Sequence, residues 1–119
     1  MIQKSTILKT SDFIGVIKVN CFHIYRKKKR MFCGFGNFIK VSNRVVISKF
    51  KKLKKRKNKA IVILLRYRVN KIDGSHVFFK KNSCVLLKRR VIAISKYITG
   101  CCVYGLRRKK FLTSFSKVI

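Results

Sequence analysis

The stretch from Ala60 to Leu87 constrains the fold more than any other part of the chain. It begins with an unbroken apolar run, Ala60–Leu65, and ends with two shorter ones, Val77–Phe79 and Cys84–Leu87. Branched and aromatic side chains favour strands, because they pack well on a pleated surface. Asp73-Gly74 lies between the runs and predicts a hairpin turn, since glycine adopts positive φ without steric cost. The stretch therefore predicts an antiparallel unit to which the more basic segments are attached.

Further strands are predicted before this unit. Met1–Thr10 fits an edge strand, and Val16–Tyr25 and Phe38–Ile47 fit two more. Ser11–Gly15 predicts a turn between the first two, with Asp12 able to accept backbone N–H bonds. The fold class that follows is mainly β: a small five-stranded β-barrel with short C-terminal helical turns.

Alternation within the second predicted strand places particular side chains together. Val19, Cys21 and His23 fall on one face if every second residue points the same way. His23 then fits a packed or RNA-facing histidine better than a metal ligand or a catalytic base. Cys33-Gly34-Phe35-Gly36 has too few glycines for a phosphate loop, and predicts a turn that brings the backbone close to RNA or to a neighbouring strand.

Charge limits the classes of function that fit. The chain of 119 residues has 32 lysines and arginines but only two acids, Asp12 and Asp73, for a net charge of +30. Two carboxylates cannot neutralise that charge, and the self-repulsion destabilises an isolated compact state. A partner must supply the counter-charge. The phosphate backbone of nucleic acid is the densest candidate and an anionic membrane surface is the second.

Two basic runs are the candidate phosphate-binding segments. Arg26–Arg30 reads RKKKR, and Ser48–Lys59 reads SKFKKLKKRKNK. Like charges in a row cannot pair with one another, so they belong in a solvated or phosphate-facing position. The second run fits either a short amphipathic helix, with Phe50 and Leu53 on one face, or a flexible cationic arm.

Catalysis and metal binding are poorly supported. The two acids lie in turn contexts, and no cysteine–histidine pair has an orienting acid. Five cysteines with irregular spacing predict reduced, partly buried thiols, and with His23 and His76 they lack zinc-finger spacing. We expect no enzyme activity, no catalytic residue, no metal site and no cofactor.

Neither a presequence nor a membrane span is evident. Met1–Lys4 leads directly into a mixed segment, and the longest apolar run, Ala60–Leu65, is far shorter than the about 20 residues that span a bilayer. We expect no membrane span, and a product made in the cytosol or inside an organelle. Abundant lysine, isoleucine, phenylalanine and asparagine favour an AT-rich genome, which is common in organelles.

Several short motifs carry a resemblance in their order and spacing. Asp12–Val16 with Cys21, Gly34–Lys40 and Lys59–Ile63 are followed by Asp73-Gly74-Ser75 with Phe79, Asn82 and Cys84–Leu87, and then by Ile98, Gly100, Leu106-Arg107 and Phe111. Together they resemble the large-subunit ribosomal protein of the universal L-fourteen family, nearly end to end. The chain departs from the family pattern at Phe13-Ile14, where asparagine and serine are usual, at Asn37, where aspartate is usual, and at Cys101, where proline is usual.

The resemblance implies one ribosomal-protein domain over residues 1–119, with the barrel at about 1–90 and the helical segment at about 91–119. It implies binding to large-subunit rRNA and to neighbouring large-subunit proteins. It also implies an intersubunit bridge to small-subunit rRNA and a surface for a ribosome-silencing factor. Together with the genome bias, it leads us to expect an organelle-encoded mitochondrial ribosomal protein, with the plastid as second choice. The alternatives are a free nucleic-acid-binding protein of the nucleoid or RNA-chaperone type and a membrane-active cationic protein.

Candidate site residues come from the matched basic positions and from the basic runs. Those expected at rRNA phosphates are Lys18, Arg26, Lys27, Lys28, Lys29, Arg30, Lys40, Lys51, Lys52, Lys54, Lys55, Arg56, Lys59 and Arg107. Those expected at the intersubunit bridge or factor surface are Lys96, Tyr97, Arg108, Lys109 and Phe111. Phe35, Tyr67 and Tyr104 are the aromatic candidates for stacking on unpaired bases.

Overall fold

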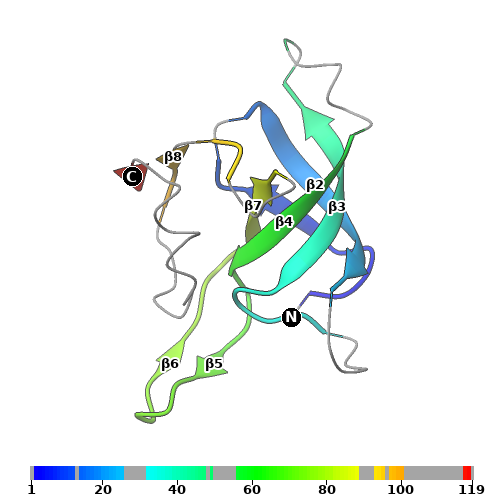
Figure 1. Cartoon of the computed structure of the whole chain (residues 1–119). Helices are drawn as coiled ribbons and strands as arrows, with labels where there is room; N and C mark the ends of the chain where they lie inside the picture. The colour runs from blue at the N-terminus through cyan, green and yellow to red at the C-terminus, as the bar shows by residue number, and fades with distance from the viewer. Residues whose placement is uncertain are drawn as a thin grey trace.

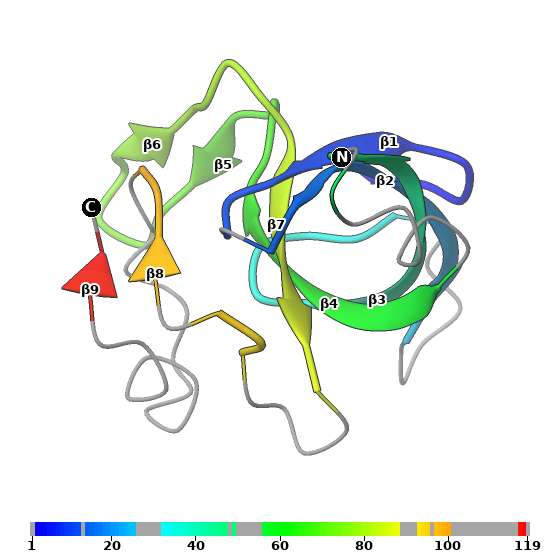
Figure 2. The same cartoon turned by 90° about the horizontal axis from the view of Figure 1, so that it is seen from above.

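Five strands close into a barrel in the order β1-β2-β3-β4-β7 (Figure 1). The computed structural model describes residues 2–12, 14–25, 32–47, 49, 56–88, 93–95, 97–100 and 117–118. The barrel strands are β1 (Ile7–Thr10), β2 (Val16–Ile24), β3 (Phe38–Val46), β4 (Lys57–Leu64) and β7 (Ser83–Leu87). Seen from above in Figure 2, these strands surround a single interior. The prediction of a mainly β, five-stranded barrel is confirmed.

The first strand closes the barrel and is not an edge strand, so that prediction was wrong. β1 pairs with β2 in antiparallel fashion and with β7 in parallel, where Lys9 faces Ser83 and Thr10 faces Cys84. The Ser11 N–H donates to the Cys84 carbonyl at 3.0 Å, which extends the contact past the end of β1. Alternating polarity gives no sign of this partner, because the pairing joins residues more than 70 positions apart.

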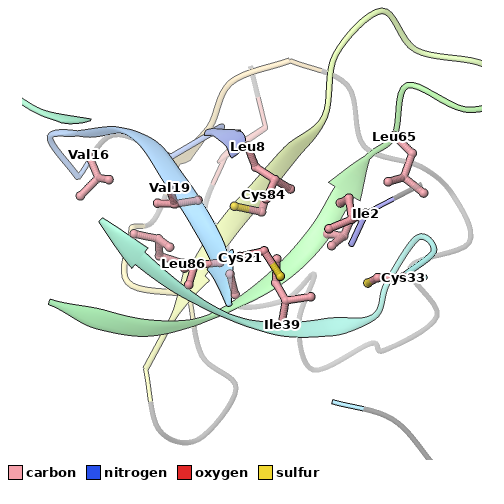
Figure 3. Packing of buried hydrophobic residues seen from close by; sticks show 13 residues of the cluster. Ile2, Leu8, Val16, Val19, Cys21, Cys33, Ile39, Leu65, Cys84 and Leu86 are labelled. Carbon is pink, nitrogen blue, oxygen red and sulfur yellow. The ribbon is translucent and has the colours of Figure 1, made fainter. Parts of the chain in front are cut away.

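The barrel interior is filled by alternate residues of the strands (Figure 3). On β4 and β7, Ala60 faces Leu86 and Val62 faces Cys84, and all four side chains are buried inside. Burying apolar surface at about 25 cal/mol per Å² is the main force that holds such an interior together. The other members of this core are Ile2, Leu8, Val16, Val19, Cys21, Cys33, Ile39, Val41 and Leu65.

A second core lies on the outer face of β4 and β7. Ile61 faces Val85 across these strands, and both side chains pack with Ala93 and Ile98 from the segment that follows the barrel. Asp12 pairs with Ile98, and Leu87 pairs with Ala93, in isolated backbone bridges that fix this layer in place. Burial on both faces explains why Ala60–Leu65 and Cys84–Leu87 are continuous apolar runs and do not alternate.

The Asp73-Gly74 turn forms a hairpin, as predicted, but the hairpin is an arm outside the barrel. β5 (Val69–Asn70) pairs with β6 (His76–Val77), and Figure 1 shows this arm projecting away from the barrel. At its tip the Asp73 carboxylate accepts the Ser75 N–H at 3.0 Å, and Gly74 has φ +85°. The arm lies between β4 and β7 in the sequence, and these two strands pair with each other in the barrel.

A bulge in β2 changes the predicted face of His23. The register with β3 shifts between Cys21 and His23, so Cys21 faces Val41 and His23 faces Lys40. Such a bulge adds one residue to one strand and redirects the side chains after it. Val19 and Cys21 point inward as expected, whereas the His23 side chain is exposed. The alternation that placed all three on one face was therefore wrong at His23.

The glycine-rich turn approaches a neighbouring strand, one of its two predicted roles. The Gly36 N–H donates to the Val62 carbonyl at 2.9 Å, and Gly36 has φ +71°. The Phe35 ring meets Phe79 edge to face, with centroids 6.0 Å apart, and packs against the barrel core. Phe35 therefore serves packing, and its ring does not form a free stacking surface.

The C-terminal region adds a short parallel sheet. β8 (Tyr97–Ile98) pairs with β9 (Lys117–Val118). The helical segment predicted at about 91–119 lies mostly outside the described residues, and its described parts, 93–95, 97–100 and 117–118, contain β8 and β9 and no helix. Among the residues that the structure does describe, no helix is long and apolar enough to cross a membrane.

Candidate nucleic-acid interface

The outer face of β2, β3 and β4 carries rows of polar and charged side chains. One row runs across the three strands from His23 through Lys40 to Lys59, which are direct cross-strand partners. The next row runs from Asn20 through Ser42 to Lys57. Period-two alternation places these residues outside, except His23, which the bulge in β2 turns outward.

Aromatic rings border the row of His23, Lys40 and Lys59. The Tyr25 N–H donates to the Phe38 carbonyl at 3.1 Å, so these two residues are adjacent at the ends of β2 and β3. The Lys59 ammonium lies 4.7 Å from the centroid of the Phe38 ring and 5.2 Å from that of Tyr25. The His23 ring meets the Tyr25 ring edge to face at 5.0 Å. We call His23, Tyr25, Phe38, Lys40 and Lys59 the aromatic–lysine patch.

Charge on this patch is not balanced by acids of the chain. Lys40 and Lys59 are directly opposite across an antiparallel pair, an arrangement that destabilises a sheet. The only two acids in the sequence are elsewhere: Asp73 is at the tip of the arm, and Asp12 is buried between β1 and β2. A polyanion on this face would relieve the repulsion between the two lysines.

A second like-charge pair lies on the neighbouring part of the barrel. Lys9 faces Lys18 across β1 and β2, and Lys18 also faces Val45 on β3. Arg56, just before β4, is exposed, and its carbonyl accepts the Asn43 N–H at 3.1 Å. Of the predicted rRNA residues, the structure brings Lys40 and Lys59 together and sets Lys18 toward the other end of β2.

The remaining predicted contacts are only partly described. Tyr97, predicted for the bridge or factor surface, is 45% exposed on β8, and its N–H donates to the Ser95 hydroxyl at 3.2 Å. The other predicted residues lie outside the described part of the chain: Arg26, Lys27, Lys28, Lys29, Arg30, Lys51, Lys52, Lys54, Lys55, Lys96, Arg107, Arg108, Lys109 and Phe111. Tyr104, a stacking candidate, also lies outside it.

Sequence reasoning missed several members of this face. Lys57 lies in the predicted basic run Ser48–Lys59 but was not named as a single contact, although it is two positions before Lys59 and therefore on the same face. Its ammonium lies 5.7 Å from the centroid of the Phe22 ring. Tyr25 and Phe38 were assigned only to strands. The signal that could have found them is their place in register with the matched lysines, which requires the strand pairing.

The buried titratable groups do not form a reactive site. Burial raises the pKa of Asp12 to about 6, and the Leu86 N–H, which donates to its Oδ2 at 3.1 Å, partly offsets this rise. Burial also raises the pKa of the Cys21 and Cys84 thiols, which keeps them protonated and weakly nucleophilic. Within the described ranges, no group of three or more histidines, cysteines and acids could hold a metal ion.

Comparison with known proteins agrees with these features. The family model described as "Ribosomal protein L14p/L23e" matches residues 1–118. The large ribosomal subunit protein uL14m of Tetrahymena pyriformis is 44% identical over 115 residues, which cover 97% of this chain and 97% of that protein. The match extends through the barrel, the arm and the C-terminal region. The chain therefore belongs to the L14p/L23e family of large-subunit ribosomal proteins, whose role is structural and not enzymatic.

Proposed function

We propose that this chain is a structural constituent of the large ribosomal subunit that binds large-subunit rRNA through phosphate contacts. The observation that carries the proposal is the pair of lysines on β3 and β4, where Lys40 faces Lys59 without an acid on the same strands. Lysines neutralise phosphates and release condensed counterions, which makes binding strong and dependent on salt. The rRNA is recognised by backbone and shape, as is usual for folded RNA.

We further propose that the C-terminal region contributes to an intersubunit bridge and contacts neighbouring proteins or a silencing factor. Support comes from the exposed Tyr97 on the layer that packs against β4 and β7. The mitochondrial ribosome is the proposed location, because the Tetrahymena relative is a mitochondrial ribosomal protein. Organelle encoding is supported by the AT-rich residue bias, with the plastid as the second choice.

Sedimentation of an organelle lysate through a sucrose gradient tests the proposal. The chain should migrate with the large subunit and remain there at moderate salt. A chain found mainly free would instead favour the nucleoid or RNA-chaperone alternative, and a chain found mainly on membranes would favour the membrane-active one. Either result would overturn the ribosomal proposal.

A further inference from the structure

We propose that the aromatic–lysine patch binds an unpaired nucleotide of RNA, whose base stacks on the Tyr25 ring while its phosphates lie against Lys40 and Lys59. The proposal rests on the function proposed above, because it names the part of the RNA that this face of the barrel takes. It adds a direct contact to a base, at Tyr25, to the phosphate contacts proposed above.

The exposure of Tyr25 is the first observation. Its side chain is 41% exposed and belongs to neither hydrophobic core, unlike Phe35, which is partly buried and packs against the barrel core. Phe38, which lies beside it in the patch, is partly buried and packs against the second core. A large aromatic side chain left in solvent at the end of a paired strand is available for stacking on a partner.

Orientation of the ring is the second observation. The His23 ring lies edge to face with Tyr25 at an interplanar angle of 86°, and the Tyr25 N–H is bonded to Phe38. The bulge at Cys21–His23 is what turns His23 to the outside and against Tyr25. The Tyr25 ring is contacted by the His23 ring and by the Lys59 ammonium, and a ring held in this way loses little conformational entropy when a base stacks on it.

The third observation is the placement of charge around the ring. Lys59 is within 5.2 Å of the Tyr25 centroid, and its direct cross-strand partner is Lys40. Single-stranded nucleic acids bind where cations follow the backbone and aromatic rings accept the bases. Bases in a duplex are stacked on each other and cannot reach such a ring. The combination therefore selects unpaired RNA over duplex RNA.

Binding of the full chain to two RNA probes tests the proposal. The probes are a short single-stranded oligoribonucleotide that contains 2-aminopurine and a duplex of equal length. Tyr25→Leu should weaken binding of the single strand about 5- to 150-fold, from the usual range for one stacked base, and leave duplex binding unchanged. It should also abolish the quenching of 2-aminopurine that stacking causes. Tyr25→Phe keeps the ring and should restore both properties.

Phe78→Leu is the matched control, since Phe78 is also an exposed aromatic residue, at 56%, but directly follows β6 in the arm. It should leave binding of both probes unchanged. Unaltered single-strand binding in Tyr25→Leu, or an equal loss for both probes, would overturn the stacking proposal. This outcome is distinct from failure of the ribosomal proposal, which the position of the wild-type chain in the sucrose gradient decides.

Discussion

The Asp12 carboxylate accepts the backbone N–H of Leu86 at 3.1 Å, across 74 positions of sequence. This bond joins the end of β1 to the middle of β7. The Ser11 carbonyl next to Asp12 accepts both the N–H and the hydroxyl of Thr99, at 2.8 and 2.9 Å. Ser11 and Asp12 thus connect the barrel to the layer that covers β4 and β7. The expected backbone bond of Asp12 exists, but it is long-range and does not close a local turn.

The position of Asp12 predicts how stability depends on pH. Burial raises its pKa from 3.8 to about 6, so the folded state holds the proton more tightly than the unfolded state. Stability from this group is complete below pH 3.8 and is lost as pH rises through about 6. Asp12→Asn keeps an acceptor for Leu86 and removes the ionisation. Relative to the wild type, it should become more stable with rising pH, by a total of about 3 kcal/mol.

Chemical denaturation between pH 4.5 and 7.5 should show about 2 kcal/mol of this difference, because ionisation of the unfolded state begins near pH 3.8. Asp73→Asn is the control, because its hydrogen bonds to Ser75 lower the pKa of Asp73 and move its titration below this window. A difference between wild type and Asp12→Asn that does not change with pH would contradict the prediction.

Core packing predicts a large loss of stability at Ile39. This side chain is fully buried in the barrel core, where strands β2 and β4 flank it. Ile39→Ala should lower the free energy of unfolding by about 2–5 kcal/mol, because it removes buried apolar surface and leaves a cavity. Ile72→Ala is the matched control at the fully exposed tip of the arm, and it should change stability by less than about 0.5 kcal/mol. Equal effects at the two sites would contradict the placement of the core.

The arm should be dispensable for the barrel. Leu64 and Ser83 are direct partners where β4 meets β7, so the chain leaves the barrel and returns to it at one place. Replacing Asn70–His76 with a short glycine-containing turn should retain β-rich circular dichroism and cooperative thermal unfolding. The measurement would contradict the structure if the shortened chain unfolded without a transition.

Local patterns predicted the barrel strands, and non-local contacts were the part they could not supply. Turn chemistry at Asp73-Gly74 and the apolar runs identified the hairpin and the strands on either side of it. The parallel pairing of Lys9 with Ser83 and the bulge before His23 depend on strands that meet only in the folded chain. The sequence did indicate the second core, because a run as uniformly apolar as Ala60–Leu65 implies a strand that is buried on both faces.

The candidate site was predictable by residue but not as an arrangement. Lys40 and Lys59 were identified individually by their match to the family. That they face each other, and that Tyr25 and Phe38 lie beside Lys59, depends on the register of three strands. Register follows from which residues are buried, and a single bulge changes it, so sequence alone could not assign the patch.

Opposed effects on stability and on RNA binding are expected from the Lys40–Lys59 pair. Lys40→Gln removes a like-charge pair directly opposite in the sheet, so the free protein should gain about 0.2–1 kcal/mol of stability. The same change removes a phosphate contact, so affinity for RNA should fall and the slope of log K against log salt should become less steep by about 0.7–0.9. Thermal unfolding and RNA titrations across a salt series measure the two effects. Lys71→Gln, with the same loss of charge next to the tip of the arm, is the control and should not gain stability in this way. A Lys40→Gln protein that is less stable when free would contradict the repulsion between Lys40 and Lys59. An unchanged salt slope would show that Lys40 does not contact a phosphate.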